Sequence, residues 1–231
     1  MPNESENTRP TISNIRKMLS QAEKGGVQNT IQNCVTVLQN DPILADSIRL
    51  NLLSERIDIV KPMGWQRSGP TLTDTDMMYI LRRMKKYGLY SEKRVSAAIR
   101  IVANENHYHP IRDYLNELKW DGTARISRAL HRFLGAAEDE LTTEALKIFL
   151  LGAIKRVFHP GCKFEMMLCL VGGQGAGKSS FFRLLAIKDE WFSDDLRRLD
   201  DDNVFRKLQG HWIMEMSEMI ATANAKSIEE I

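Results

Sequence analysis

The sequence predicts an α/β fold in which an incomplete parallel sheet follows a mainly α-helical module. Three observations lead to this prediction. An almost unbroken apolar run at residues 165–171 is typical of a strand buried on both faces of a parallel sheet. A glycine-rich segment follows at residues 172–179, and residues 180–186 have the apolar composition of a helix start. Before this region, apolar residues recur mostly at helical spacing.

The N-terminal elements are mainly helical in pattern. Residues 1–10 are polar and are predicted to form a disordered tail. Alternation of polar and apolar residues at 56–61 predicts a short strand, and Trp65 is predicted to begin a second strand that pairs with it. This combination favours a winged-helix-like or other compact helical module. Helices are predicted within residues 12–22, 31–38, 73–87, 95–102, 111–118, 126–134 and 146–157.

The domain boundary is expected between about residues 108 and 142, in a stretch of turns and short helices. We assign residues 11–125 to the helical module and residues 126–231 to the N-terminal part of an α/β domain. The strand, the glycine-rich loop and the following helix then lie together in the second domain.

The glycine-rich segment fits the pattern G-x-x-x-x-G-K-[ST] of a phosphate-binding loop. Glycines allow successive backbone N–H groups to point at phosphate oxygens. Lys178 would contact the β and γ phosphates of ATP, and Ser179 would bind Mg²⁺. A glycine-rich turn with a chance Lys-Ser pair is the alternative. The order of strand, loop and helix favours a P-loop NTPase-type sheet, with these nucleotide-binding residues: Gly172, Gly173, Gln174, Gly175, Ala176, Gly177, Lys178, Ser179 and Ser180.

A second apolar run, at residues 210–218, is interrupted by the carboxylates of Glu215 and Glu218. A triphosphatase needs an acidic group for Mg²⁺ and a base that orients water, so both glutamates are candidates for catalysis and for the metal. Ordinary surface glutamates at a solvated strand end are the alternative. A strand that extends through Glu218 would put the two on opposite faces, whereas a loop from Met216 would let them converge. Which of them holds the metal stays open.

The overall composition excludes few functions. A net charge of +2 neither requires nor rules out a nucleic-acid partner, because a basic face can exist within a balanced total. Cys34, Cys162 and Cys169 form no CxxC pair, which favours reduced thiols in a cytoplasmic protein. The N-terminus has no apolar signal-peptide core, and no apolar run reaches the length of a membrane span.

Two further groups of residues have an ordinary and a functional interpretation. His107, His109 and His131 could hold a metal, but without a fourth ligand at a recognisable spacing, surface or capping histidines are favoured. The basic pairs at 82–83 and 85–86 lie on the polar side of a predicted helix. They could contact phosphate backbones, although an ordinary solvated helix face is the favoured interpretation.

Several segments in order resemble the virulence-associated E family of phage and genomic-island proteins. They are residues 104–123, the phosphate loop, residues 191–194 and residues 210–219. The Leu-Lys-Trp-Asp-Gly sequence at 118–122, together with the Glu-x-x-Glu segment at 215–218, is quite specific, whereas the loop alone is not. The resemblance extends over roughly residues 50–231.

The resemblance implies a DNA-replication ATPase similar to superfamily 3 helicases and phage primase-helicases. Such proteins use ATP and Mg²⁺, act on DNA and tend to form homo-oligomeric rings. In these relatives an essential acid follows a glycine at the distance that separates Gly210 from Glu218. The resemblance therefore makes Glu218 the first choice for this acid, with Glu215 beside it.

The short stretch from residue 165 to the end departs from the family pattern. Each strand–helix unit of a parallel sheet takes about 30 residues or more, so we expect the sheet to be incomplete at its C-terminus. The polar sensor and the arginine finger of the family have no counterpart. Hydrolysis of ATP would depend on these elements. Two alternatives are a non-catalytic DNA-binding module and a regulatory interaction protein with a vestigial nucleotide pocket.

Overall fold

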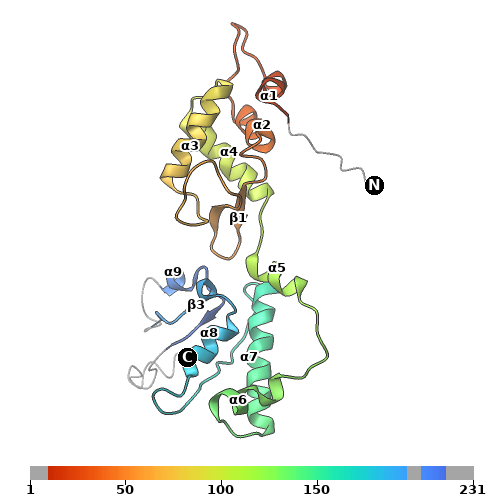
Figure 1. Ribbon diagram of the computed structural model, residues 1–231, viewed down its shortest axis with the longest axis vertical. Coiled ribbons are helices and arrows are strands. Elements are labelled where there is room, and N and C mark those ends of the chain that lie inside the picture. Colours follow the sequence, from red (N-terminus) through yellow and green to blue (C-terminus); the bar gives the residue numbers. More distant parts are fainter. Residues whose placement is uncertain (1–9, 197–203, 217–231) are drawn as a thin grey trace. The chain divides into compact units, whose positions relative to one another are not determined.

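The computed structural model describes residues 10–196 and 204–216 (Figure 1). The chain divides into two compact units, the first ending at His109 and the second beginning at Pro110. We call them unit 1 and unit 2 and describe each by itself. The division lies upstream of the 125/126 boundary assigned from the sequence.

Unit 1 is mixed in secondary structure but mainly helical, as the sequence predicts. Its antiparallel hairpin pairs β1 (Ile48–Asn51) with β2 (Arg56–Ile59), with Ile48 opposite Ile59. Its α-helices are α1 (Ile12–Met18), α2 (Ile31–Asn40), α3 (Asp74–Met84) and α4 (Glu92–Glu105), with the 3₁₀ helix η1 (Lys85–Tyr87) between the last two. The winged-helix-like arrangement stays a prediction.

Local sequence determines where α3 begins and where η1 ends. The Thr73 hydroxyl accepts a hydrogen bond from the Asp76 N–H, and the Asp76 carboxylate accepts one from the Thr73 N–H, which forms a capping box. Gly88 ends η1 with a φ of 85°, a left-handed conformation that costs a glycine little. Both ends of the helical stretch predicted within residues 73–87 are therefore confirmed.

The interior of unit 1 combines a continuous apolar core with a few buried, paired carboxylates. Buried side chains of α2, α3 and α4 pack together with Ile48 and Ile59 of the hairpin. Fully buried Asp41 accepts hydrogen bonds from Arg83 Nε at 2.6 Å and Tyr87 Oη at 2.5 Å. Burial alone would raise the pKa of Asp41, but these hydrogen bonds and two from backbone N–H groups lower it overall.

The prediction that Trp65 opens a strand beside residues 56–61 is wrong. The partner of β2 is β1, and Trp65 lies in the long loop before α3. There its indole Nε1 donates to Asp76 Oδ1 at 2.7 Å, and its ring stacks on Tyr79 with the centroids 4.8 Å apart. These contacts fix the loop side chain on α3 and need no strand pairing.

Unit 2 contains the 19-residue helix α7 (Glu140–Phe158), several shorter helices and, among its described residues, a very short parallel strand pair. β3 (Phe192–Ser193) pairs in parallel with β4 (Ile213–Met214). Buried Leu130, Leu146 and Phe181 form the centre of its core. The helices are α5 (Pro110–Glu117), α6 (Ile126–Leu134), α7 (Glu140–Phe158), α8 (Lys178–Leu185), η2 (Asp189–Trp191) and α9 (Val204–Leu208).

The buried strand predicted at residues 165–171 is not formed in the structure. Leu168 and Leu170 pack partly against the core of unit 2, but Cys169 is exposed and Val171 is 89% exposed. A buried parallel strand needs backbone partners on both sides. Within residues 10–196 and 204–216, no strand pairs with this segment, so the predicted parallel sheet is not evident. The apolar run therefore packs against the core of unit 2 with the side that carries Leu168 and Leu170, while the side that carries Cys169 and Val171 is exposed.

Across the part of the chain that the structure describes, no helix has both the length and the apolar character needed to cross a bilayer.

Candidate phosphate-binding site

The glycine-rich loop takes the left-handed turns that its glycines permit. Gly175 has a φ of 83° and Gly177 a φ of 82°, conformations that L side chains rarely adopt. A Cβ atom at Gly172, Gly173 or Gly175 would meet nothing within 4 Å. These positions therefore face open space, and the backbone of the loop is accessible to a ligand.

The loop leads directly into the N-terminus of α8. Gly177 occupies the cap position, and no side chain among the described residues caps the helix. The first backbone N–H groups of a helix lack partners within the helix, and the helix dipole adds positive potential there. This end of α8 is therefore suited to an anion such as a phosphate group.

Lys178, the first residue of α8, turns back over the loop. Its Nζ donates hydrogen bonds to the carbonyl oxygens of Gly172 and Gly173, both at 2.8 Å. An ammonium group has three donors, so these contacts hold the charge at the loop and leave one donor over. The amine needs only to exchange carbonyl oxygens for phosphate oxygens to engage a nucleotide.

Ser179 connects the loop to a residue far along the chain. Its Oγ donates to Glu215 Oε1 at 2.7 Å. Glu215 follows β4 directly, and its N–H donates to the Ser193 carbonyl oxygen at 2.8 Å, which continues the parallel pairing of β3 and β4. The strand pair therefore positions this carboxylate beside the phosphate loop.

The second carboxylate oxygen of Glu215 has no hydrogen-bond partner among the described residues, although it is buried. A buried, unsatisfied carboxylate oxygen is costly unless a partner or a cation compensates it. A serine hydroxyl and a carboxylate are oxygen ligands of the kind that Mg²⁺ takes in nucleotide sites. The donor set of Ser179 and Glu215 thus fits Mg²⁺ on an observation independent of the loop motif.

Among the described residues, the structure shows no side-chain hydrogen bond or ion pair for the others predicted to form the site. Ser180 is exposed in the first turn of α8, as are Gln174 and Ala176 in the loop. Glu218 lies outside the described residues. Of the predicted polar side chains, the structure brings together Lys178, Ser179 and Glu215.

Arg183 belongs to this region although it lies outside the phosphate-loop motif. It lies four positions after Ser179 on α8, a spacing that puts two residues on the same helix face. Its guanidinium lies 3.8 Å from Asp194 Oδ2 and 5.2 Å from the Phe192 ring centroid, so it connects α8 to the chain around β3. The four-residue spacing from the motif serine is the signal that could have indicated it.

Two tryptophans hold the strand pair in place. Trp212 N–H donates to the Trp191 carbonyl oxygen at 2.8 Å, and the two rings meet edge to face with centroids 6.3 Å apart. The Trp212 indole Nε1 also donates to the Ala153 carbonyl oxygen of α7 at 3.2 Å. Because Glu215 follows Trp212 closely, this anchoring fixes the position of its backbone.

The histidines considered for a metal have ordinary backbone contacts. His107 Nδ1 lies 2.8 Å from the Asn104 carbonyl oxygen, and His131 Nδ1 lies 2.8 Å from that of Ala136. His109 is buried in unit 1. In the described ranges 10–196 and 204–216, no three histidine, cysteine or acidic residues form a group that could hold a metal ion.

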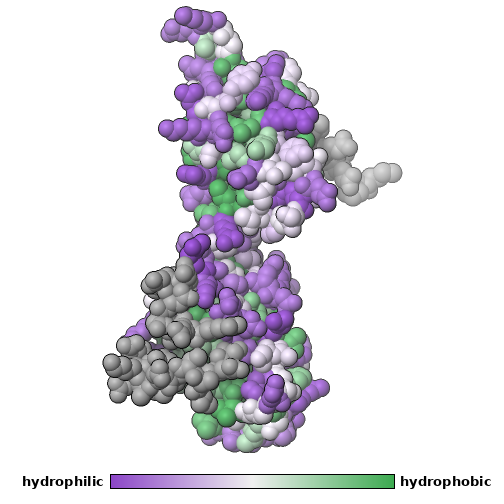
Figure 2. Space-filling view, turned by 90° about the vertical axis from the view of Figure 1, so that its left-hand side faces the viewer, coloured by the Kyte–Doolittle hydropathy of each residue, from purple (hydrophilic) through white to green (hydrophobic). Residues whose placement is uncertain are grey.

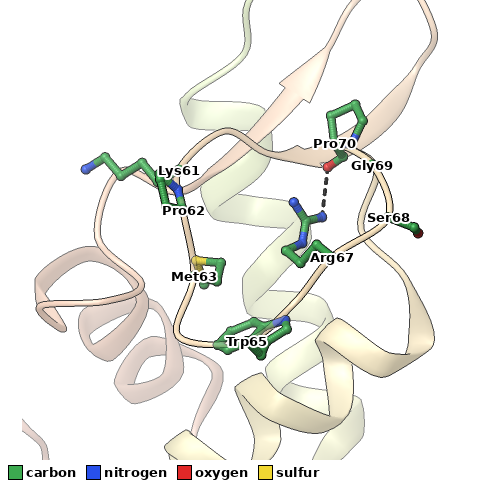
Figure 3. Close-up of a pocket in the computed structure, with 8 residues that line it drawn as sticks. All are labelled: Lys61, Pro62, Met63, Trp65, Arg67, Ser68, Gly69 and Pro70. Atoms are coloured by element: carbon green, nitrogen blue, oxygen red, sulfur yellow. Dashed lines mark hydrogen bonds between the residues drawn. The ribbon is translucent and has the colours of Figure 1, made fainter.

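Unit 1 has an open hollow of about 470 Å³ in the loop between β2 and α3 (Figure 3). Arg67, at its wall, donates to Ile59, Pro70 and Thr71 carbonyl oxygens and to both Asp76 oxygens. Lys61 donates to the Ala45 carbonyl oxygen and to Asp46. Both cations are thus occupied in holding the loop, so the hollow has no unengaged cation for a phosphate.

Comparison with protein families identifies the second part of the chain. A family model described as the virulence-associated protein E-like domain matches residues 115–231, half of the chain. The match begins within α5 and includes the phosphate loop, α8 and both short strands. A search of curated proteins gave no match. The chain belongs to the virulence-associated protein E-like domain family.

Proposed function

We propose that the chain binds ATP and Mg²⁺ at the loop of residues 172–180 and acts as a helicase-like P-loop ATPase in DNA replication of a phage or mobile element. The observation that carries the proposal is the hydrogen bond from Ser179 to Glu215, beside an uncapped helix N-terminus. A motif serine meets an acidic residue from a distant part of the chain there, which a chance glycine-rich turn would not require.

In this proposal each side chain has a separate task. Lys178 exchanges its two carbonyl contacts for oxygens of the β and γ phosphates, and the N–H groups of the loop and of α8 bind the remaining phosphate oxygens. Ser179 and Glu215 hold Mg²⁺, which neutralises charge on the phosphates when bound. Glu218 is the essential acid that the resemblance to the family implies, and with Glu215 on the metal we assign to it the orientation of the attacking water.

Hydrolysis of ATP requires groups that nucleotide binding alone does not. Charge that develops on the phosphates during transfer is stabilised in many P-loop enzymes by an arginine from a neighbouring subunit. The ATPase proposal therefore includes a ring-forming homo-oligomer on DNA.

A second candidate function is supported by residues 165–171. The segment before the loop has no strand partner among the described residues, and Val171 beside the loop is 89% exposed. A phosphate loop without a surrounding sheet is less rigid than one at the edge of a parallel sheet. In this alternative the nucleotide pocket is vestigial, and the chain is a non-catalytic DNA-binding or regulatory interaction module.

Binding of a fluorescent ATP analogue to the full chain tests the first proposal. Lys178→Ala is expected to weaken binding by about ten-fold to a hundred-fold, because it removes a charge-assisted hydrogen bond. Lys163→Ala is the matched control, since Lys163 is an exposed lysine of the same unit whose ion-pair partner is Glu165. Unchanged affinity of Lys178→Ala would overturn the proposal.

Hydrolysis separates the two candidates. If the chain is an ATPase, single-stranded DNA stimulates phosphate release, and Glu218→Gln abolishes it while nucleotide binding persists. Nucleotide binding without any hydrolysis, with or without DNA, favours the non-catalytic module.

A further inference from the structure

Unit 1 has a cluster of five basic residues at the ends of two helices. Arg16 and Lys17 lie at the C-terminal end of α1, and Arg82, Lys85 and Lys86 lie at the end of α3 and in η1. We call these five residues the basic cluster, and all of them are exposed. Figure 2, which views unit 1 from the side on which α3 lies, shows many hydrophilic residues on this face with intermediate and hydrophobic ones between them.

One side chain brings the two helix ends together. Arg16 donates from Nε to the Lys86 carbonyl oxygen at 3.1 Å, and its Nη2 contacts the same oxygen. Arg82 and Lys86 are four residues apart across α3 and η1. Cations from distant parts of the chain therefore share one surface.

The fold does not use these charges for ion pairs of its own. Arg83, in the middle of the same basic stretch, pairs with buried Asp41 and is a structural residue. Within residues 10–196 and 204–216, none of the basic cluster forms an ion pair with a carboxylate. Repulsion between these neighbours is thus left without compensation from within the described fold.

Stabilisation of a helix end does not account for the two lysines. Cations at a helix C-terminus are favourable because they lie near unpaired carbonyl oxygens. Here Arg16 already donates to the Lys86 carbonyl oxygen, and the Gly88 N–H donates to that of Lys85. Lys85 and Lys86 are both exposed, so their amines are accessible to solvent or to a ligand.

An exposed aromatic residue follows the basic cluster directly. Tyr90 comes two residues after the Gly88 turn and is 64% exposed. Among the described residues, no aromatic ring or cation packs against it. Proteins that hold single-stranded nucleic acid combine cations for the phosphates with aromatic rings on which bases stack.

We propose that the basic cluster and Tyr90 form a binding surface for single-stranded nucleic acid, with the cations on phosphates and the tyrosine stacked on a base. The inference rests on the DNA partner of the proposed function and names the surface that contacts it. An anionic membrane is disfavoured because the exposed apolar residues of this region, among them Met18, Met78 and Tyr90, are scattered over α1, α3 and the segment after Gly88. Helices that bind membrane surfaces present an apolar stripe along their length.

Binding of a fluorescein-labelled oligothymidine to the full chain, measured by anisotropy over a range of NaCl concentrations, tests the inference. Each lost phosphate contact makes the slope of log affinity against log salt shallower by about 0.7 for single strands. Lys85→Gln/Lys86→Gln is therefore expected to make the slope shallower by roughly 1.4. Arg16 is retained in every variant because its hydrogen bonds join α1 to η1.

The matched control is Arg56→Gln/Arg100→Gln, which removes two exposed cations of unit 1 from β2 and α4. It is expected to keep the wild-type slope. Tyr90→Ala is expected to weaken binding by roughly five-fold or more at constant salt slope, since a stacked base is lost. An unchanged affinity of Tyr90→Ala overturns the stacking role.

The outcomes separate this inference from the proposed function. If the wild type binds the oligonucleotide and both double variants keep the wild-type slope of log affinity against log salt, the basic cluster is not the binding surface and the inference is overturned. The DNA partner of the proposed function then stands. If the wild type does not bind the oligonucleotide but binds phosphatidylserine vesicles through Lys85 and Lys86, the nucleic-acid assignment is wrong. ATP-analogue binding, measured on the same variants, tests the phosphate loop independently.

Discussion

Unit 1 and unit 2 differ in how completely they bury their apolar side chains. In unit 1 a continuous core extends through α2, α3, α4 and the hairpin, and it includes carboxylates that are paired. In the described part of unit 2 the buried apolar side chains are fewer, with Leu130, Leu146 and Phe181 clustered together, while Leu141 is 77% and Leu151 57% exposed on α7. The proposed phosphate site therefore lies on a less buried scaffold than the proposed nucleic-acid surface, and ligands should affect the two units unequally.

The largest effect is expected from the buried carboxylate of unit 1. Asp41→Ala leaves Arg83 and the Tyr87 hydroxyl without their buried partner, and loss of one member of a buried ion pair typically costs about 3–5 kcal/mol. Urea unfolding followed by circular dichroism measures this loss. Asp46→Asn, which removes the exposed charge beside Lys61 and keeps a side chain that tolerates the φ of 56° there, is the control and should cost less than about 1 kcal/mol. Equal costs would show that the buried network does not support unit 1.

A bound nucleotide should stabilise unit 2 and leave unit 1 nearly unchanged. At a free ATP concentration of a hundred times the Kd, the expected gain is about 2.7 kcal/mol for the unit that binds it. Hydrogen exchange with and without Mg²⁺-ATP measures the gain, in the amides of α8 and, as an internal reference, in those of α4. Equal protection of both helices would contradict the assignment of the site to unit 2.

Nucleotide affinity should be more sensitive to substitution of Gly177, the left-handed glycine at the start of α8, than to substitution of a glycine outside the loop. Gly177→Ala forces a Cβ into a conformation that costs about 1–2 kcal/mol, so nucleotide affinity should fall by roughly ten-fold. Gly64→Ala is the control, because its Cβ would meet nothing within 4 Å, its φ is not positive and it lies in unit 1, outside the proposed site. If both variants bind equally well, the observed loop conformation is not the one that binds nucleotide.

Acid should weaken unit 1 through its buried carboxylates. Burial would raise the pKa values of Asp41 and Asp76, but hydrogen bonds from arginines and other donors lower both. A lowered folded-state pKa contributes stability above the unfolded value of about 4, and this contribution is lost as pH falls towards the folded value. Unit 1 is therefore expected to be less stable at pH 3 than at pH 6. Urea unfolding at both pH values should show a smaller loss for Asp41→Asn.

Most helices could be predicted from the sequence because their signals are local. Thr73 and Asp76 form a capping box at the start of the helix predicted within residues 73–87, and Gly88 ends η1 in a left-handed conformation. The strand at residues 165–171 could not be judged in this way. Its apolar composition favours burial, but a strand also requires backbone hydrogen-bond partners, and these depend on distant parts of the chain.

In the candidate site, too, local features could be predicted from the sequence and long-range contacts could not. The loop and Lys178 follow from a contiguous motif, whereas the contact between Ser179 and Glu215 depends on the pairing of two-residue strands. Strands of that length have no detectable alternation, so the sequence could not decide how Glu215 is oriented. The basic cluster depends on Arg16 reaching the Lys86 carbonyl oxygen, a contact between distant segments for which the pattern offers no signal.

The exposure of Cys169 has a practical consequence. Cys34 is buried, and burial raises the pKa of its thiol, so the nucleophilic thiolate is scarce there. Cys162 is half-buried, whereas Cys169 is exposed three residues before Gly172. A maleimide dye should therefore react first at Cys169. Its emission would then follow the arrival and departure of ligand at the loop in real time, on the natural sequence and without an engineered cysteine.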